Sequence, residues 1–271
     1  MMAPVDSDTT TPTTLIRGRW VFTPDQVITD GAVVVENDTI LAVGKWADLH
    51  SAYPQAQVLG SENHAVLPGF INAHHHSNGV PNSLLGIEDD FLELWLFSLI
   101  GLRSQPAHLK TLFSIAALLK TGVTTVVDFA VIGGSLAASE ADLKDRLSAY
   151  EQAGMRTALT AGCRYESILV HCQDEEFLTR LPLALQQDLK QHVPLQQGLA
   201  AEDYLALMAD TVRQYQDHPH IDLWFGPPGP QWVGDALLVK IVDLAQSLNT
   251  SVQTHALESF YEKLIGPKFY G

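Results

Sequence analysis

Hydrophobic and polar positions follow two different patterns along the chain. In the first pattern, between residues 15 and 58, short runs rich in β-branched residues alternate with turn signals such as Pro24-Asp25 and Asn37-Asp38. This pattern predicts a small antiparallel unit with strands over 15–22, 32–36 and 39–43. In the second pattern, from Ala65 onwards, apolar runs alternate with segments of helical period, which indicates a parallel α/β arrangement.

Five strands are expected in the second region. The first is an apolar run over 65–73, which is predicted to be a buried strand. The other strands are predicted over 124–129, 156–161, 221–226 and 251–255, and the helices over 109–121, 139–153, 201–216 and 234–248. Such an alternation is typical of a (β/α)₈ TIM-type barrel, of which about five strands are present. The expected organisation is a flexible tail over 1–14, a small β domain over 15–64 and an incomplete barrel over 65–271.

Composition narrows the classes of partner. The chain has 31 acidic and 16 basic residues, a net charge of -15, and no basic block, which argues against binding to nucleic acid or to an anionic membrane. Its tail is Thr-rich and lacks the apolar core of a signal peptide. The two cysteines, Cys163 and Cys172, fit a reducing compartment better than a disulfide framework, although one bridge stays open. The expected location is the cytoplasm.

A histidine cluster follows the first predicted strand of the barrel. His74, His75 and His76 stand at its C-terminal end. Because alternate side chains of a strand point to the same face, His74 and His76 can offer two imidazoles to one metal ion while His75 faces elsewhere. The alternative interpretation is a chance run of surface histidines.

A second group of polar residues ends the fifth predicted strand. His255 and Glu258 lie there, and the C-terminal strand ends of such a barrel converge on one site. His255 is therefore expected to meet His74 and His76, and three imidazoles suit a zinc-like ion. Glu258 is the candidate to move a proton between water and a leaving group. Alternatively, His255 is a core histidine bonded to backbone, and Glu258 is a solvated residue at a helix start.

Together these residues resemble the amidohydrolase superfamily, and specifically its triazine hydrolases, cytosine and guanine deaminases and S-adenosylhomocysteine deaminases. Four segments look like family motifs in the family's order: 68–77, 121–128, 226–231 and 255–258. The resemblance implies a barrel with a small β-sandwich that residues after the barrel complete. It also implies that His74, His76 and His255 are metal ligands and that Asp128 is structural.

The sequence departs from the family pattern in three places. The family's further His after strand six and Asp after strand eight have no counterpart, so the chain resembles an N-terminal fragment, expected to self-associate and to be inactive alone. Pro228 stands where several relatives have a His. The predicted strand 221–226 contains no Lys to bridge two metals, so one divalent ion is expected, zinc before iron.

Three further residues are candidates for substrate contact. Glu88 and Asp89 occupy a position similar to the family's acidic contact after strand one, and Arg164 lies just past strand three. The alternative is that the acidic run is solvated and that Arg164 pairs with Glu166. Trp95, Phe97 and Leu99 are interpreted as core or lid packing.

The function predicted from these features is a metal-dependent hydrolase of non-peptide C–N bonds. Its expected substrate is a small heterocycle that loses ammonia after attack by a metal-bound hydroxide, which makes it an aminohydrolase. Two alternatives stay open: an amidase or urea-type hydrolase of the same superfamily, and a non-catalytic metal-binding fragment. A homo-oligomer is also considered.

Overall fold

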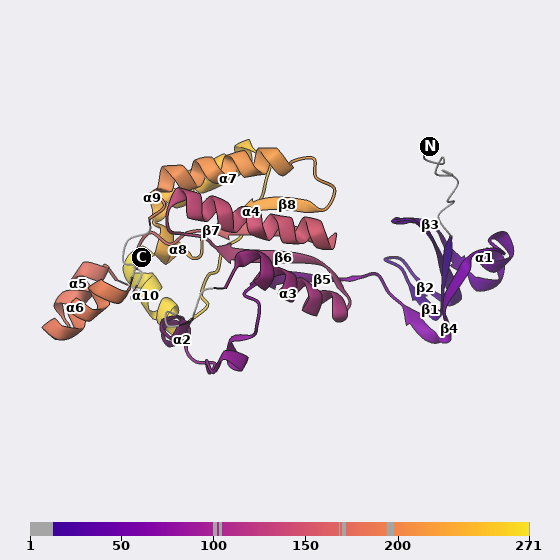
Figure 1. Cartoon of the computed structure of the whole chain (residues 1–271), viewed down its shortest axis with the longest axis horizontal. Coiled ribbons are helices and arrows are strands. Elements are labelled where there is room, and N and C mark those ends of the chain that lie inside the picture. The colour runs from indigo at the N-terminus through magenta and orange to yellow at the C-terminus, as the bar shows by residue number, and fades with distance from the viewer. Residues whose placement is uncertain are drawn as a thin grey trace, which may run out of the picture. The chain divides into compact units, whose positions relative to one another are not determined.

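The computed structural model describes residues 13–99, 102, 105–167, 169, 172–193 and 198–270. The chain divides into two compact units, Met1–Gly69 and Phe70–Gly271 (Figure 1). Residues 1–12 of the predicted tail lie outside the described residues, and Thr14 already belongs to a strand.

The first unit is one four-stranded sheet with a helix. Its elements are β1 (Thr14–Phe22), β2 (Val27–Glu36), β3 (Thr39–Lys45), α1 (Trp46–Ala52) and β4 (Gln57–Val66), in the sheet order β3-β2-β1-β4. The antiparallel pairing of β1 with β2 and of β2 with β3 confirms part of the sequence prediction. The prediction did not include β4, which adds a parallel strand beside β1. Leu15, Ala32 and Val34 form the core beneath α1.

The predicted buried strand over 65–73 is wrong. Ala65 and Val66 end β4 of the first unit, and the next strand, β5 (Phe70–His75), begins the second. Pro68 separates the two strands, since proline cannot donate to a β ladder. The new strand is exposed rather than buried: Phe70 is 55% and Ile71 71% exposed, because β5 forms an edge of the described sheet.

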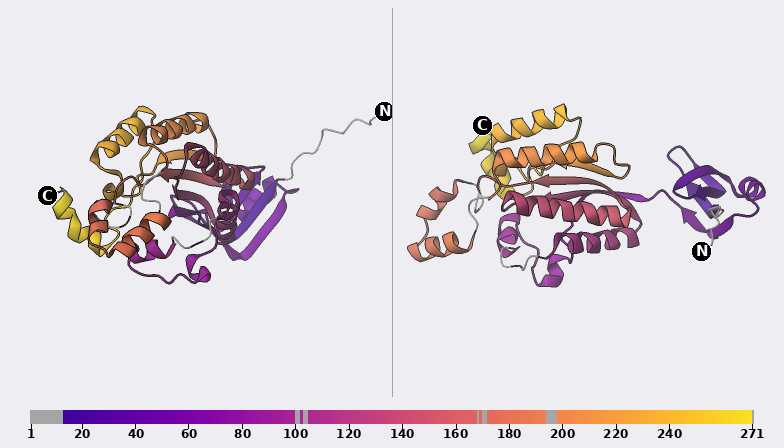
Figure 2. Two further views of the ribbon diagram at one scale, coloured as in Figure 1. Left: turned by 60° about the vertical axis from the view of Figure 1, so that its left-hand side comes forward. Right: turned by 45° about the horizontal axis from the view of Figure 1, so that its top comes forward.

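The second unit contains a parallel sheet in the sequential order β5-β6-β7-β8. The remaining strands are β6 (Val123–Val131), β7 (Arg156–Gly162) and β8 (Ile221–Phe225). The four predicted helices are present as α3 (Ala107–Lys120), α4 (Leu136–Ala153), α7 (Ala201–Tyr215) and α9 (Asp235–Ser247). Their apolar residues share one core with the sheet. Figure 2 shows the helices lying along the sheet. The predicted α/β class is therefore confirmed.

The predicted fifth strand over 251–255 is reduced to a single parallel bridge between Phe225 and Val252. Phe225 donates its N–H to Ser251 and accepts the N–H of Gln253, at 3.0 and 2.9 Å. The ladder cannot extend further because β8 ends at Phe225. His255 thus lies in a loop that leaves this bridge.

Short helices occur in the loops that follow the C-terminal strand ends. They are η1 (Asn82–Leu85), α2 (Leu92–Leu99), α5 (Asp174–Thr179), α6 (Leu183–His192), α8 (Pro230–Val233) and α10 (Phe260–Tyr270). Among the described residues, no helix has the length and apolar character needed to cross a bilayer. Cys163 and Cys172 are both free thiols, so no bridge joins them.

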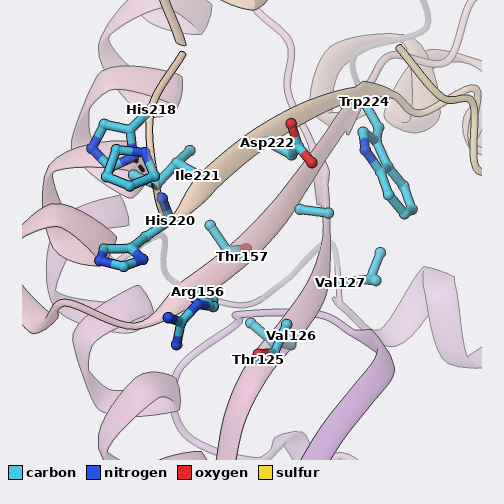
Figure 3. A pocket seen from close by; sticks show the side chains of 12 residues that line it. Thr125, Val126, Val127, Arg156, Thr157, His218, His220, Ile221, Asp222 and Trp224 are labelled. Carbon is cyan, nitrogen blue, oxygen red and sulfur yellow. Dashed lines mark hydrogen bonds between the residues drawn. The ribbon is translucent and has the colours of Figure 1, made fainter. Parts of the chain in front are cut away.

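A hollow of about 310 Å³ lies at the N-terminal ends of β6, β7 and β8 (Figure 3). Arg156, His218 and His220 contribute polar groups to its lining. The predicted histidine cluster lies at the opposite, C-terminal ends of the strands, where active sites of such folds occur. The hollow is therefore not the candidate site.

The backbone at the C-terminal end of β7, Gly162, lies very close to the residue that follows β8, Gly226. Gly226 donates its N–H to the Ala161 carbonyl at 2.8 Å. A Cβ atom added to Gly162 would lie 1.5 Å from the Gly226 carbonyl oxygen. Only glycine fits at residue 162, and this contact fixes where the loop after β8 begins.

We expect Gly162→Ala to lower the free energy of unfolding by about 3 kcal/mol or more, because backbone must move to relieve the clash. Gly154→Ala is the matched control: Gly154 has a φ of 64° but no atom within 4 Å of an added Cβ. That change should cost about 1–2 kcal/mol through backbone strain alone. Urea unfolding of both variants measures the difference, and equal losses would contradict the close approach.

Candidate metal centre

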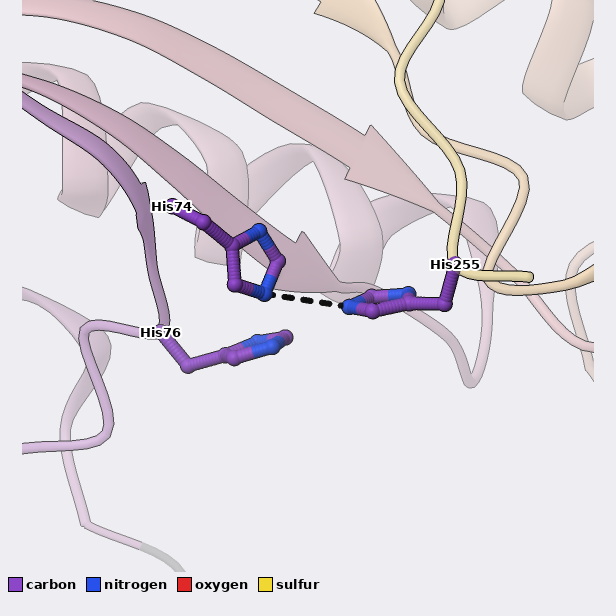
Figure 4. A group of neighbouring side chains, drawn as sticks. All are labelled: His74, His76 and His255. Atoms are coloured by element: carbon purple, nitrogen blue, oxygen red, sulfur yellow. Dashed lines mark hydrogen bonds between the residues drawn. The ribbon is translucent and has the colours of Figure 1, made fainter. Parts of the chain in front are cut away.

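Three imidazoles converge at the C-terminal edge of the parallel sheet (Figure 4). His74 is the second-last residue of β5, His76 directly follows the strand, and His255 comes from the loop after the Phe225–Val252 bridge. One ligand nitrogen from each of the three lies within 4.8 Å of the other two. Residues 181 positions apart in the sequence thus meet, as predicted.

The spacing of one pair of these nitrogens fits a tetrahedral ion. The Nε2 atoms of His74 and His255 are 3.3 Å apart. Two nitrogens bound to one tetrahedral zinc ion at about 2.0–2.1 Å would lie about 3.3–3.4 Å apart. Without an ion, a proton on His74 Nε2 makes this contact a hydrogen bond to the lone pair of His255 Nε2.

Backbone carbonyls orient two of the rings. The Nδ1 atom of His76 lies 2.9 Å from the Phe129 carbonyl oxygen, and that of His255 lies 2.8 Å from the Pro228 carbonyl oxygen. A carbonyl only accepts, so each Nδ1 carries the proton and each Nε2 keeps its lone pair for a ligand. Metal-binding histidines commonly have this arrangement.

The environment favours the neutral imidazoles that bind metal. Burial, followed by the nearby His74 and His255, lowers the pKa of His76 to about 4. Burial and His255 also lower the pKa of His74. The buried ring of Phe129 lies beneath the cluster, with its centroid 4.5 Å from that of His255 and 5.5 Å from that of His76.

Two neighbours of the cluster have other roles. His75 does not join the group of ligand atoms among the described residues, which agrees with the strand alternation. Asp128 is fully buried and accepts hydrogen bonds from the Ser77 N–H and the Tyr150 hydroxyl, at 2.8 and 3.0 Å. The expectation that Asp128 is structural is therefore confirmed.

Glu258 is exposed beside the cluster. Its charge partly opposes the lowering of the pKa by burial at both His74 and Arg164, so its carboxylate lies within electrostatic reach of both residues. A different residue, Glu262, accepts the N–H groups of Leu257 and Glu258, each at 2.8 Å. Glu262 thus accepts the hydrogen bonds of the backbone N–H groups before α10, so the Glu258 side chain is not needed as their acceptor.

Arg164 lies at the same edge of the sheet. Its guanidinium carbon stands 4.3 Å from the ring centroid of Trp232. Burial lowers its pKa, and the charge of Glu258 opposes that shift. In the described part of the chain Arg164 forms no ion pair with Glu166, so the structural alternative for Arg164 is wrong. The carboxylate of Glu166 lies against Gly234 instead.

Glu88 and Asp89 are not brought into the cluster. Both are exposed between η1 and α2, and neither forms a hydrogen bond or ion pair within the described ranges. The helix that follows them does approach the site, because Ser259 donates a hydrogen bond to Glu93 of α2. The arrangement agrees with the alternative of a solvated acidic run.

Sequence reasoning missed the groups that hold the histidines in place. The carbonyls of Phe129 and Pro228 carry no sequence signal, because every residue has a carbonyl. Gln253 was also missed, although its side chain donates a hydrogen bond to the Ala73 carbonyl at 3.4 Å and so links the bridge to β5. Its position two residues before His255 on the predicted strand was the available signal.

Comparisons with known families agree with this geometry. The model described as "Amidohydrolase family" matches residues 65–265, and the one described as "Imidazolonepropionase-like composite domain, bacteria" matches residues 31–56.

Curated relatives carry deaminase names. The chain is 26% identical to a 5-methylthioadenosine/S-adenosylhomocysteine deaminase of Thermodesulfovibrio yellowstonii, over 92% of this chain and 51% of the relative. It is 24% identical to a 5'-deoxyadenosine deaminase of Methanobrevibacter smithii, over 91% of this chain and 49% of the relative. The chain thus spans about half the length of these relatives.

Solved structures share the fold. A zinc-bound adenosine deaminase of Xanthomonas campestris has a TM-score of 0.64 at 24% identity, covering 95% of this chain and 52% of that one. A mutant atrazine chlorohydrolase of Arthrobacter aurescens, complexed with zinc and atraton, has a TM-score of 0.70 at 18% identity, covering 95% and 56%. The barrel class predicted from the sequence agrees with these neighbours.

We expect His76→Ala to remove most of the zinc that the chain binds, because it deletes an imidazole already oriented by the Phe129 carbonyl. His75→Ala should retain nearly all of it, since His75 lies outside the ligand group of the described residues. Zinc per chain, measured by elemental analysis after dialysis, distinguishes the two variants. Equal losses would contradict the placement of the histidines.

Proposed function

Because this chain belongs to the amidohydrolase family, we propose that it acts as a metal-dependent aminohydrolase, releasing ammonia from a small heterocyclic substrate. The observation that carries the proposal is the group of three imidazoles at the C-terminal strand ends. The deaminase names of the relatives support the same reaction. Because the chain spans about half of their length, activity is proposed for the protein in its complete form.

His74, His76 and His255 are the proposed ligands of one divalent ion. Their Nε2 spacing and the two Nδ1–carbonyl bonds support zinc, which favours imidazole and tetrahedral geometry. Iron also accepts imidazole ligands and is the alternative ion. An ion bound there would supply Lewis-acid activation of water and substrate.

Glu258 is the proposed proton carrier. Its carboxylate is exposed, lies within electrostatic reach of His74 and accepts no hydrogen bond among the described residues. A carboxylate with these properties can take a proton from the attacking water and deliver it to the departing nitrogen. Glu262 performs the backbone contacts that would otherwise occupy it.

Arg164 is the proposed contact for a polar part of the substrate. Stacking on Trp232 holds its guanidinium at the site edge, and its Nε has no hydrogen-bond partner among the described residues. Glu88 and Asp89 stay candidates only if the loop before α2 moves toward a bound substrate. The names of the relatives favour a purine nucleoside or a related adenosine derivative.

Two other predictions belong to this proposal. The free thiols of Cys163 and Cys172 support the cytoplasm as the location, because reduced cysteines are typical of that compartment. The exposed Phe70 and Ile71 on edge strand β5 support self-association of the chain. No observation favours an amidase or a purely metal-binding role over the deaminase.

We expect the zinc-loaded, complete protein to release ammonia from adenosine derivatives such as 5'-deoxyadenosine, and to leave simple amides and urea intact. A coupled ammonia assay over a panel of aminopurines, aminotriazines and amides measures this preference. Release from amides alone would favour the amidase alternative, and the absence of release from every member would contradict the proposed enzyme.

In the same assay, Glu258→Gln should keep its zinc while turnover falls by about 10²-fold or more, because the amide cannot carry the proton. Glu262→Gln is the matched control. It keeps one carbonyl oxygen to accept one of the two N–H groups of Leu257 and Glu258, leaves the proposed proton carrier in place, and should lower turnover far less. Unchanged turnover in Glu258→Gln would rule out the proposed role.

A further inference from the structure

Three buried polar side chains lie behind the metal centre and take no part in the proposed chemistry. Ser77 directly follows His76, Asp128 comes from β6, and Tyr150 comes from α4. All three residues are 0% exposed. Buried polar groups are costly unless they are fully hydrogen-bonded, so such a group beside a candidate site calls for a physical reason.

Hydrogen bonds join the three residues to one another. Asp128 accepts the backbone N–H of Ser77 at Oδ1, at 2.8 Å, and the Tyr150 hydroxyl at Oδ2, at 3.0 Å. The Ser77 hydroxyl lies 3.3 Å from the Tyr150 hydroxyl oxygen. Because the single proton of Tyr150 goes to Asp128, the Ser77 hydroxyl is the donor to Tyr150. Burial and the charge of Asp128 raise the pKa of Tyr150, so this proton is retained.

These hydrogen bonds hold the segment after β5 in a region where the ladder between β5 and β6 is interrupted. The pairing of β5 with β6 is irregular between Asn72 and His75, and β5 has no other strand neighbour in the described sheet. Two consecutive residues of β6 take over this task. Asp128 binds the backbone of Ser77 through its carboxylate, and Phe129 binds the ring of His76 through its carbonyl.

We propose that Tyr150 is a positioning residue, which acts through Asp128 and Ser77 to fix where His76 stands in the metal centre. This inference rests on the proposed metal centre. Loss of the Tyr150 hydroxyl leaves one oxygen of a buried carboxylate without its partner, and the carboxylate then shifts along with the Ser77 backbone. His76 moves with its neighbour and presents its Nε2 less accurately.

Zinc affinity, measured on the full chain by competition with a chromophoric chelator, tests the inference. Tyr150→Phe should weaken zinc binding by about tenfold, the lower range for loss of a group that supports a ligand. Tyr204→Phe is the matched control: Tyr204 is equally buried, and its hydroxyl donates to the Ala161 carbonyl at 2.9 Å, away from β5. It should lower the Tm to a similar extent and change zinc affinity by less than about twofold.

A second pair of variants keeps the test independent of how well Tyr150→Phe folds. Asp128→Asn retains a carbonyl oxygen for the Ser77 N–H and should bind zinc within about threefold of the wild type. Asp128→Ala has no acceptor and should lose about tenfold or more. The visible spectrum of bound Co²⁺ should change in Tyr150→Phe and Asp128→Ala and stay unchanged in Tyr204→Phe.

The possible results distinguish a failure of the positioning role of Tyr150 from a failure of the proposed metal centre. Wild-type zinc affinity in both Tyr150→Phe and Asp128→Ala, or an equal loss in Tyr150→Phe and Tyr204→Phe, would overturn the positioning role alone. A wild-type chain that binds no zinc would overturn the metal centre, and the inference with it.

Discussion

The hydrogen-bond ladder of the parallel sheet β5-β6-β7-β8 is the constraint on which the site depends. Because all four strands run in the same direction, their C-terminal ends meet at one edge, and the loops that leave them lie side by side. The ladder thereby brings His76, the Phe129 carbonyl and the Pro228 carbonyl together, and the bridge at Val252 adds His255. Candidate ligands from two segments and orienting carbonyls from two others thus come together at one edge.

Backbone carbonyls then orient the side chains that the ladder brings together. The three histidines supply the candidate ligand atoms, and carbonyls fix the orientation of two of their rings. The loop that carries the Pro228 carbonyl begins at a close backbone contact, since Gly162 lies too near the Gly226 carbonyl for any side chain to fit. The geometry of the centre is thus set by the main chain of β6 and of the loop after β8, and the imidazoles follow it.

The sequence predicted the parts of this arrangement that repeat along the chain. Alternation of apolar runs identified β6, β7, β8 and their helices, and the spacing of His74 and His76 identified two members of the candidate ligand group. The sequence did not reveal that Pro68 divides the run over 65–73 between two units. Nor did it reveal that Val252 alone, of the predicted strand 251–255, forms a bridge with Phe225 of β8. Those outcomes depend on which neighbours a strand finds. Tyr150 escaped notice because a tyrosine on an amphipathic helix looks like ordinary core packing.

X-ray absorption spectroscopy at the zinc edge of the loaded chain tests most directly whether these three imidazoles bind one ion. The account predicts nitrogen or oxygen neighbours at about 2.0–2.1 Å, with the outer-shell scattering of about three imidazole rings. A spectrum with sulfur neighbours, or with the scattering of one imidazole or none, would contradict it.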